Sequence, residues 1–140
     1  MIVVDASVVV KLFREEPGSE LAEQLYSDNH GDLCGPDLLA VEVAAALVRN
    51  ANMVKAARAA MDCALGELDL MLRDAALVLH RTSATQLAEA ARLALGLGHP
   101  LKDCLYVALA MELGCPLVTA DARFMAKAHE VYGDVRMLDE

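Results

Sequence analysis

Short apolar segments that alternate with helical patterns constrain the fold of this chain more than any other feature. Five segments are expected to be strands: residues 1–4, 32–35, 75–79, 116–119 and 135–138. Helices are expected between and beside them, at residues 7–13, 19–26, 37–49, 53–72, 83–95, 103–113 and 122–129. Strands this short and uniformly apolar are typical of a parallel sheet that helices cover on both faces. The pattern therefore predicts an α/β fold with a parallel sheet of four or five strands.

The length and composition of the chain favour one ordered domain. Its 140 residues are the usual size of a single domain, so residues 1–140 are expected to form one unit. Hydrophobic residues make up 56% of the chain, which is enough apolar surface to offset the entropy lost on folding. No apolar run approaches the roughly 18 residues of a membrane span, and the early Asp5 does not fit a signal peptide. We therefore expect a cytoplasmic protein that does not enter a membrane.

The charge of the chain argues against a broad surface for binding nucleic acid. Twelve basic residues stand against 21 acidic ones, and the formal net charge is −9. A protein with this charge repels a polyanion unless the repulsion is overcome locally. Divalent cations held by several carboxylates would neutralise them and attract phosphate. Such a site would reconcile the acidic composition with a nucleic-acid substrate.

The cysteines and histidines do not predict a zinc site, because no C-x-x-C or H-E-x-x-H spacing is present. The cysteines are expected to be small buried apolar residues in a reducing compartment: Cys34, Cys63, Cys104 and Cys115. Residues 53–72 have the spacing of an amphipathic helix. Its Met53, Met61 and Met71 are expected in the core, with a dimer interface as the alternative. A capping box of Ser83 and Gln86 marks the start of the helix at 83–95.

Glu42 is the acidic residue that fits a surface position least well. Its helical neighbours three and four places away are all apolar: Leu38, Leu39, Ala45 and Ala46. Glu42 is therefore expected on the buried face of its helix, where an unpaired ionised carboxylate costs on the order of several kcal/mol. It should pair with a cation, bind a metal or be protonated. The alternative is a side chain at the rim of the apolar face that reaches water.

Three further acids stand where an α/β sheet presents its chemistry. Asp5 and Asp121 follow expected strands, and Asp103 begins the helix that precedes the strand before Asp121. Each of the three on its own could be a helix cap. Ligands of such sheets bind at the carboxyl ends of the strands. We therefore expect these three acids and Glu42 to converge at one edge of the sheet.

Acids that converge in this way repel one another unless they hold hard divalent cations through their oxygens. Mg²⁺ or Mn²⁺ is the natural occupant. A pair of such ions, roughly 4 Å apart, activates a water and stabilises the leaving oxygen when a phosphodiester is cleaved. Ser7 and Thr119 each lie two residues from one of the acids and are expected to orient water or a carboxylate. Helix capping is the alternative role for these two hydroxyls.

Four segments carry a resemblance to a known family: residues 2–7, 40–44, 102–110 and 117–124. They contain the four acids and span nearly the whole chain. In these segments the sequence closely resembles the PIN-domain family, and in particular the VapC-type toxins of toxin–antitoxin pairs. The resemblance implies one PIN-like ribonuclease domain over residues 1–140.

The resemblance also implies roles for residues and partners. Asp5, Glu42, Asp103 and Asp121 would be the catalytic acids that bind Mg²⁺ or Mn²⁺, with Ser7 and Thr119 supporting them. The protein would be an endoribonuclease acting on structured RNA, a homodimer, and the target of a cognate antitoxin that covers the site. Many relatives carry an aromatic or apolar residue and an alanine beside the third acid, where this chain has Lys102 and Cys104. This departure affects the expected contacts with substrate and not metal binding.

Contacts with the RNA backbone are expected from three basic residues, Lys11, Arg14 and Lys102, for which surface solubility is the alternative role. Two other activities are weighed against the nuclease. A haloacid-dehalogenase-like phosphatase also places an Asp after its first strand and uses Mg²⁺, but it needs a second acid where this chain has Ser7. A PIN-like module that only binds RNA or a partner protein is the non-enzymatic alternative. The four mutually repelling carboxylates argue against that module.

Overall fold

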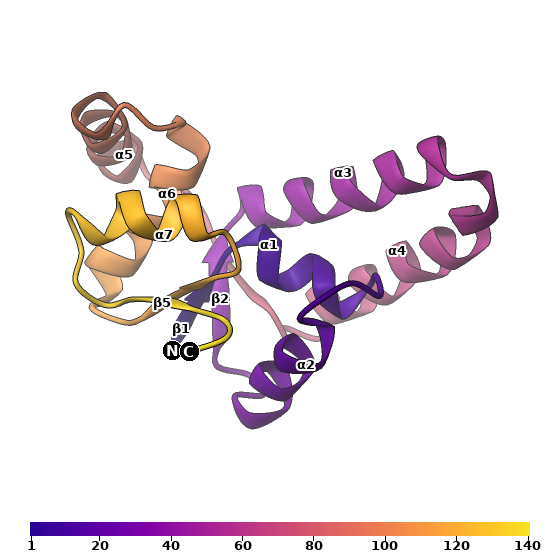
Figure 1. The fold of residues 1–140 in the computed structure, drawn as a ribbon. Helices are drawn as coiled ribbons and strands as arrows, with labels where there is room; N and C mark the ends of the chain where they lie inside the picture. The colour runs from indigo at the N-terminus through magenta and orange to yellow at the C-terminus, as the bar shows by residue number, and fades with distance from the viewer.

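A parallel five-stranded sheet organises the chain in the computed structural model, which describes residues 1–140 (Figure 1). The strands are β1 (Ile2–Val4), β2 (Leu33–Pro36), β3 (Val78–His80), β4 (Leu117–Thr119) and β5 (Val135–Met137). The helices are α1 (Ala6–Val9), α2 (Ser19–Asp28), α3 (Leu38–Met53), α4 (Arg58–Arg73), α5 (Ala84–Leu97), α6 (Leu101–Leu113) and α7 (Ala122–His129). Two short 3₁₀ turns, η1 (Val10–Leu12) and η2 (Lys55–Ala57), complete the elements. The expected α/β fold is confirmed.

The strand order, β3-β2-β1-β4-β5, places β1 at the centre of the sheet. The chain moves outward from β1 through β2 to β3, then returns to add β4 on the other side of β1. Val3 is in register with Cys34 of β2 on one side and with Leu117 of β4 on the other. The strand order thus reverses between β1 and β4. In an open α/β sheet, the crevice at such a switch point is the usual place for a ligand.

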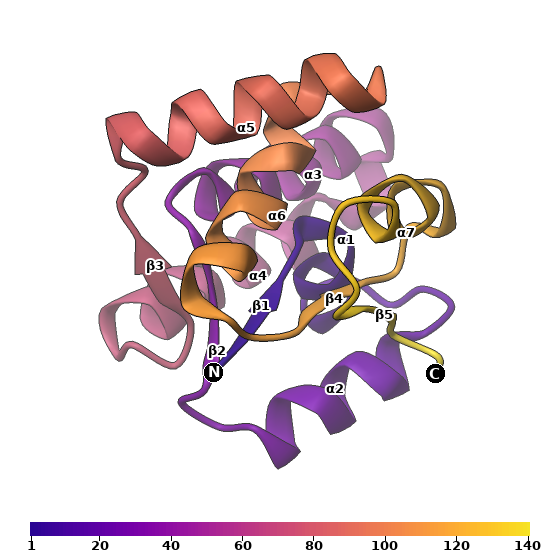
Figure 2. The ribbon, with the colours of Figure 1, turned by 90° about the vertical axis from the view of Figure 1, so that its left-hand side faces the viewer.

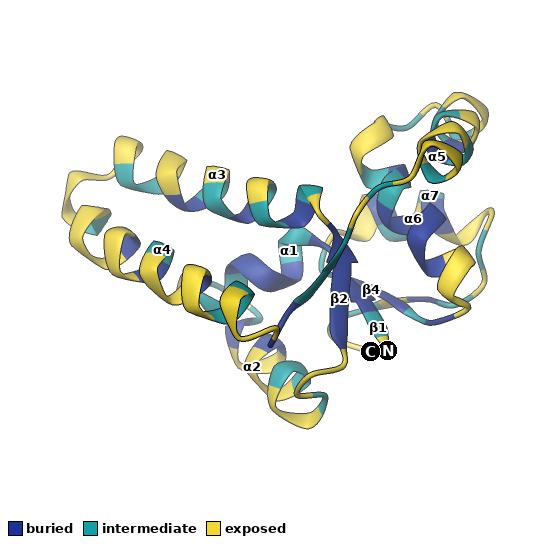
Figure 3. Cartoon of the chain, turned by 180° about the vertical axis from the view of Figure 1, so that it is seen from behind, coloured by how far each residue is buried: buried dark blue, intermediate teal, exposed yellow.

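Helices cover both faces of the sheet, which explains why its central strand β1 is entirely apolar. Helices α1 to α4 lie on one side of the sheet and α5 to α7 on the other (Figure 1). Helix α6 crosses one face and packs on β1, β2 and β4 (Figure 2). Val3, Val4 and Leu117 are completely buried as a result, and the buried surfaces in Figure 3 line the sheet and the helix faces turned toward it. None of the helices combines the length and apolar character needed to cross a membrane.

The helix boundaries differ from the expected ones in three places. The first helix ends at Val9 and continues only as the 3₁₀ turn η1. The break between the two long helices falls at Val54, which is extended, and not between residues 49 and 53. Helix α6 starts at Leu101, directly after Pro100, which has the extended ψ of 139°. A proline at this position cannot donate a helical hydrogen bond, so it ends the preceding turn and begins the new helix. The capping box of Ser83 and Gln86 is confirmed.

The expected burial of the methionines and cysteines is only partly confirmed. Met61 is 5% exposed and Met71 packs against the core, but Met53 is 76% exposed. Met53 is the last residue of α3, where the hairpin with α4 extends beyond the sheet and nothing covers this side chain. Cys63 is also exposed, on the outer face of α4. The other cysteines are buried and free, as expected: Cys34, Cys104 and Cys115.

Candidate active site

Asp5 lies at the switch point, directly after β1 and beside the end of β4. It occupies the position before α1, but its side chain makes no capping hydrogen bond, so the alternative role as a helix cap is not what the structure shows. The residue is only 6% exposed. Its two carboxylate oxygens accept hydrogen bonds from Ser7 Oγ and Thr119 Oγ1, each at 2.5 Å. The two expected supporting hydroxyls therefore hold the carboxylate from both sides.

The two hydroxyls are themselves fixed by the backbone that follows β4. Ser7 Oγ accepts a hydrogen bond from the Ala120 N–H at 2.9 Å, and Thr119 Oγ1 accepts one from the Asp121 N–H at 3.0 Å. Because each hydroxyl oxygen accepts from a backbone N–H, its own proton is free to point at Asp5. Ser7 and Thr119 therefore act as donors to the carboxylate and orient it.

Burial raises the pKa of Asp5 from 3.8 to about 6, since an ionised carboxylate loses its hydration there. The hydrogen bonds from Ser7 and Thr119 act in the opposite direction, because they favour the charged form. The nearby Asp103 carboxylate raises the pKa further through repulsion. A cation beside Asp5 would relieve both the burial cost and this repulsion.

Asp103 lies in the first turn of α6, where the partial positive charge of the helix N-terminus favours an acid. Its Oδ2 atom lies 2.7 Å from Nε2 of His99, four residues earlier in the chain. Neither side chain is far from solvent, with 21% of Asp103 and 10% of His99 exposed. Sequence reasoning did not single out His99. The four-residue spacing to Asp103 was the signal that could have identified it.

Glu42 projects from α3 toward α6 and is paired there, as an acid on an apolar helix face requires. Its Oε1 accepts a hydrogen bond from the Tyr106 hydroxyl at 2.6 Å, and its Oε2 lies 3.1 Å from Nζ of Lys102. Only 16% of the Glu42 side chain is exposed. Of the options expected from the sequence, pairing with a cation is the one observed. The structure thus brings together residues from α3 and α6 that lie 60 and 64 positions apart in the sequence.

Tyr106 is a site residue that sequence reasoning counted as part of the apolar face of α6. The residue is 1% exposed, and its hydroxyl donates to Glu42. Burial first, and then this hydrogen bond, raise the pKa of Tyr106, so the hydroxyl keeps its proton and remains a donor. The carboxylates near enough to raise the pKa further are those of Glu42, Asp5 and Asp103. The charges of three of the four acids therefore act on one buried hydroxyl.

Asp121 differs from the other three acids. Its Oδ1 caps α7 by accepting hydrogen bonds from the backbone N–H groups of Arg123 and Phe124, at 3.0 and 3.1 Å. The residue is exposed, and it is linked to Asp5 only through Thr119. The capping role weighed from the sequence is therefore present at Asp121. Its second carboxylate oxygen accepts no hydrogen bond from the protein.

The donor atoms at this edge of the sheet suit a hard divalent cation, because they are carboxylate oxygens with hydroxyls in support. No three His, Cys, Asp or Glu side chains lie close enough together in this conformation to hold a metal ion. Lys102 contacts one carboxylate oxygen of Glu42, and His99 contacts one oxygen of Asp103. The other oxygen of Asp103 accepts no hydrogen bond. Asp5 and Asp103, whose charges repel each other, are the two acids whose oxygens could hold such a cation.

A groove of about 500 Å³ lies beside these acids, between α1 and α3, and three cationic residues line it: Lys11, Arg49 and Lys102. Lys102 was expected to contact substrate, and Arg49 was not. The Arg49 charge acts on Lys102 and lowers its pKa, against the larger effect of Glu42 that raises it. Arg49 and Lys102 thus place positive charge on the wall of the groove, where it would attract an anion.

Lys11 and Arg14 are less suited to substrate than the sequence indicated. Lys11 Nζ donates to Glu16 at 3.1 Å and to the Pro17 carbonyl at 2.8 Å, and only 14% of its side chain is exposed. It thus fastens the loop before α2. Arg14 lies 3.8 Å from Glu16 and does not line the groove. Both charges are offset by the same glutamate.

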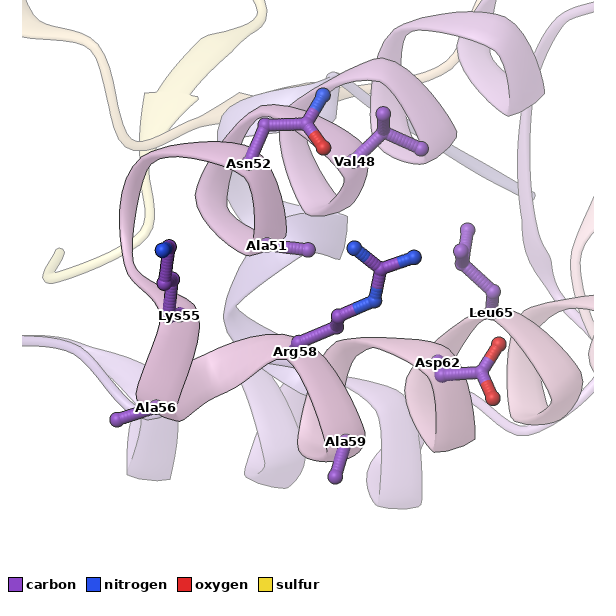
Figure 4. Close-up of a pocket in the computed structure, with 9 residues that line it drawn as sticks. All are labelled: Val48, Ala51, Asn52, Lys55, Ala56, Arg58, Ala59, Asp62 and Leu65. Carbon is purple, nitrogen blue, oxygen red and sulfur yellow. The ribbon is translucent and has the colours of Figure 1, made fainter.

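A second pocket, of about 580 Å³, lies at the far end of the α3–α4 hairpin (Figure 4). Figure 4 shows Arg58 pointing into the space between the two helices, with Val48 and Leu65 beside it. Asp62 is the only carboxylate among its lining residues. None of the residues expected at the active site lines this pocket, so it is separate from the acids.

The fold and the site define the class of this protein as a small α/β domain with a buried acid, Asp5, at the switch point of an open parallel sheet. The chain belongs to the PIN domain family, whose model matches residues 2–130. A VapC ribonuclease of Rhizobium meliloti (strain 1021) is 32% identical, in an alignment that covers 84% of this chain and 92% of the relative. The resemblance expected from the sequence is confirmed.

Two solved structures show the same fold. PAE2754 from Pyrobaculum aerophilum has a TM-score of 0.70 and 21% identity, covering 99% of this chain and 89% of its own. VapC20 of Mycobacterium tuberculosis, a toxin that cleaves the sarcin–ricin loop, has a TM-score of 0.71 and 14% identity, covering 90% of this chain and 94% of its own. At these identities the comparisons support the fold alone.

Proposed function

We propose that this chain is a metal-dependent endoribonuclease of the VapC type, with Asp5, Glu42, Asp103 and Asp121 as its metal-binding catalytic acids. The observation that carries the proposal is the buried Asp5 at the β1–β4 switch point, held by two hydroxyls and repelled by the charge of a second acid, Asp103. Membership of the PIN domain family and the relationship to a VapC ribonuclease supply the reaction class. The cofactor would be Mg²⁺ or Mn²⁺, because the donors are carboxylate oxygens.

The residues divide the work of phosphodiester hydrolysis. A bound divalent cation supplies a more acidic water and stabilises the charge that develops on the phosphate. Asp5 and Asp103 would hold the cation, and Ser7 and Thr119 keep the Asp5 carboxylate in one orientation. Tyr106 does the same for Glu42. Lys102 and Arg49 bind the RNA backbone along the groove.

The remaining parts of the proposal concern partners and place. The similarity to a VapC ribonuclease favours a cognate antitoxin that covers the groove. Because the chain has a net charge of −9, a basic segment of the partner would suit it. A homodimer and a cytoplasmic location are proposed on the same relationship. A haloacid-dehalogenase-like phosphatase has no support, because the chain belongs to a different family and Ser7 serves Asp5 as a hydrogen-bond donor.

The test is metal-dependent RNA cleavage by the purified chain and by two variants, Asp5→Asn and Asp103→Asn. Both substitutions keep the shape of the side chain and remove its charge. We expect each to reduce cleavage in Mg²⁺ or Mn²⁺ by about a hundredfold or more, since each removes a metal ligand. Asp62→Asn, an exposed aspartate on α4, is the matched control and should cleave normally.

Circular dichroism and thermal melting must show that the variants remain folded. Cleavage at the full rate by folded Asp5→Asn or Asp103→Asn would rule out these acids as the catalytic centre. A folded wild-type chain that neither cleaves RNA nor binds Mn²⁺ in calorimetry would instead favour the module that only binds RNA or a partner protein.

A further inference from the structure

His99 is a largely buried histidine, with 10% of its side chain exposed, and the proposed roles of the catalytic acids do not explain its presence. It lies in the short connection between α5 and α6. Gly98 before it has a φ of +62°, which ends α5, and Pro100 after it begins α6. The His99 N–H also donates to the Ala94 carbonyl at 3.1 Å. The backbone at this position is therefore fixed on both sides.

The imidazole ring of His99 makes two contacts with different parts of the site. Its Nε2 atom lies 2.7 Å from Asp103 Oδ2. Its face stacks on the ring of Phe124, with the centroids 5.6 Å apart and the planes at 11°. Phe124 is 1% exposed and belongs to α7, and its backbone N–H is capped by Asp121. The ring thus connects the acid on α6 with the helix that Asp121 begins.

These contacts restrict how the Asp103 carboxylate can turn. The stack on Phe124 restricts the plane of the imidazole, and in that plane Nε2 lies 2.7 Å from Asp103 Oδ2. The second oxygen of Asp103 accepts no hydrogen bond within the protein. A carboxylate with one oxygen held by a donor and the other free is the usual arrangement of a metal ligand and its supporting group.

We propose that His99 is a positioning residue that orients Asp103 for the divalent cation and links it to the helix capped by Asp121. This inference rests on the proposed function, because it assigns Asp103 to metal binding. The imidazole takes the tautomer that carries its proton on Nε2 and donates to Oδ2. His99 touches neither the cation nor the RNA.

The test separates the hydrogen bond from the stack. His99→Phe keeps an aromatic ring against Phe124 and removes the donor, whereas His99→Gln restores an N–H donor and removes the ring. His129→Phe, on the exposed end of α7, is the matched control. The readout is the Kd for Mn²⁺ from titration calorimetry, together with thermal melting in EDTA.

We expect His99→Phe to bind Mn²⁺ about tenfold more weakly than the wild type, as loss of a group supporting a metal ligand does. His99→Gln should remain within about threefold of the wild type, and His129→Phe should be unchanged. Melting in EDTA should be similar for wild type and His99→Phe, which would show that the weaker Mn²⁺ binding does not come from lower stability. A purely structural histidine would instead lower stability without changing Mn²⁺ affinity. Raising the Mn²⁺ concentration should restore cleavage by His99→Phe.

An unchanged Mn²⁺ affinity in folded His99→Phe overturns the inference while leaving the proposed function intact. Loss of Mn²⁺ binding by the folded wild type overturns the proposed function itself. If His99→Phe does not fold, the comparison passes to His99→Gln and His99→Asn. The longer Gln is then expected to bind Mn²⁺ better than the shorter Asn, and equal affinities would reject the positioning role.

Discussion

Two opposing effects act on the carboxylate of Asp5. Burial favours the neutral form, and the hydroxyls of Ser7 and Thr119 favour the charged form. The result is a pKa of about 6, against 3.8 for the unburied side chain. A carboxylate in this state costs stability at neutral pH when no cation is bound. This cost is expected of a residue that is retained for binding a metal and not for folding.

The pH dependence of stability tests this interpretation. The folded-state pKa of Asp5 is raised, so its contribution to stability is complete below pH 3.8 and is lost as the pH rises through about 6. Asp5→Asn removes this dependence. In EDTA, the free energy of unfolding of the variant relative to the wild type should increase by up to about 3 kcal/mol between acid and neutral pH. Urea unfolding at a series of pH values measures the difference, and a difference that does not vary with pH would contradict the raised pKa.

Lys102 precedes Asp103 in α6, and its ammonium group neutralises Glu42 directly. The ammonium group lies 3.1 Å from Glu42 Oε2 and would compete with a metal for the same carboxylate. We predict that Lys102→Met increases the affinity for Mn²⁺ by about threefold to tenfold, because it removes a competing cation. It should also weaken RNA binding, since the groove loses a positive charge.

Lys55→Met is the control for Lys102→Met. It changes the net charge equally, and Lys55 has no ion pair and lies at the tip of the α3–α4 hairpin. Calorimetry with Mn²⁺ measures both variants. Equal affinities in the two variants would show that Lys102 does not compete for the site.

Among the helices, α3 and α4 form a hairpin that reaches beyond the sheet, and their inner faces pack on each other (Figure 1). The hydrophobic period of the sequence identifies both helices. It does not show which positions the partner helix covers at the tip. Met53 and Met61 are the same type of residue and both fit the apolar spacing of an amphipathic helix, yet Met53 is exposed and Met61 is buried.

Paired substitutions in this hairpin should separate stability from function. Met61→Ala removes a buried side chain and is expected to cost about 2–5 kcal/mol in the free energy of unfolding. Met53→Ala should cost less than about 0.5 kcal/mol, because the side chain is already exposed. Chemical denaturation measures both, and Mn²⁺ affinity should be unchanged in each. A large loss of stability in Met53→Ala would indicate that the tip of the hairpin is covered, as in a dimer.

For the whole molecule, the net charge of −9 and an RNA substrate are compatible only if the charge is offset locally. Three cations line the groove, but two of them, Lys11 and Lys102, are paired with glutamates. A divalent cation at the acids would supply the missing positive charge. Metal removal should therefore affect RNA binding as well as cleavage.

We predict that RNA affinity increases at least about tenfold when Ca²⁺ is added to protein in EDTA, because the metal cancels repulsion between acids and phosphate. Fluorescence anisotropy of a labelled RNA measures this at constant ionic strength, with NaCl as the matched control. Asp5→Asn should lose most of the increase. The same Kd in EDTA and in Ca²⁺ would show that the acids do not govern RNA binding.

The amino-acid sequence alone determines the order of strands and helices, the parallel sheet and the candidate acids. These features depend on the local spacing of apolar residues and on the type of residue that follows a strand, such as Asp5 after β1. Only the tertiary structure decides which acids meet and what holds them. The contacts of Glu42 with Lys102 and Tyr106 span about 60 residues, and the stack of His99 on Phe124 joins two helices. Such contacts depend on how the elements pack, and no local pattern encodes the distance between side chains on separate helices.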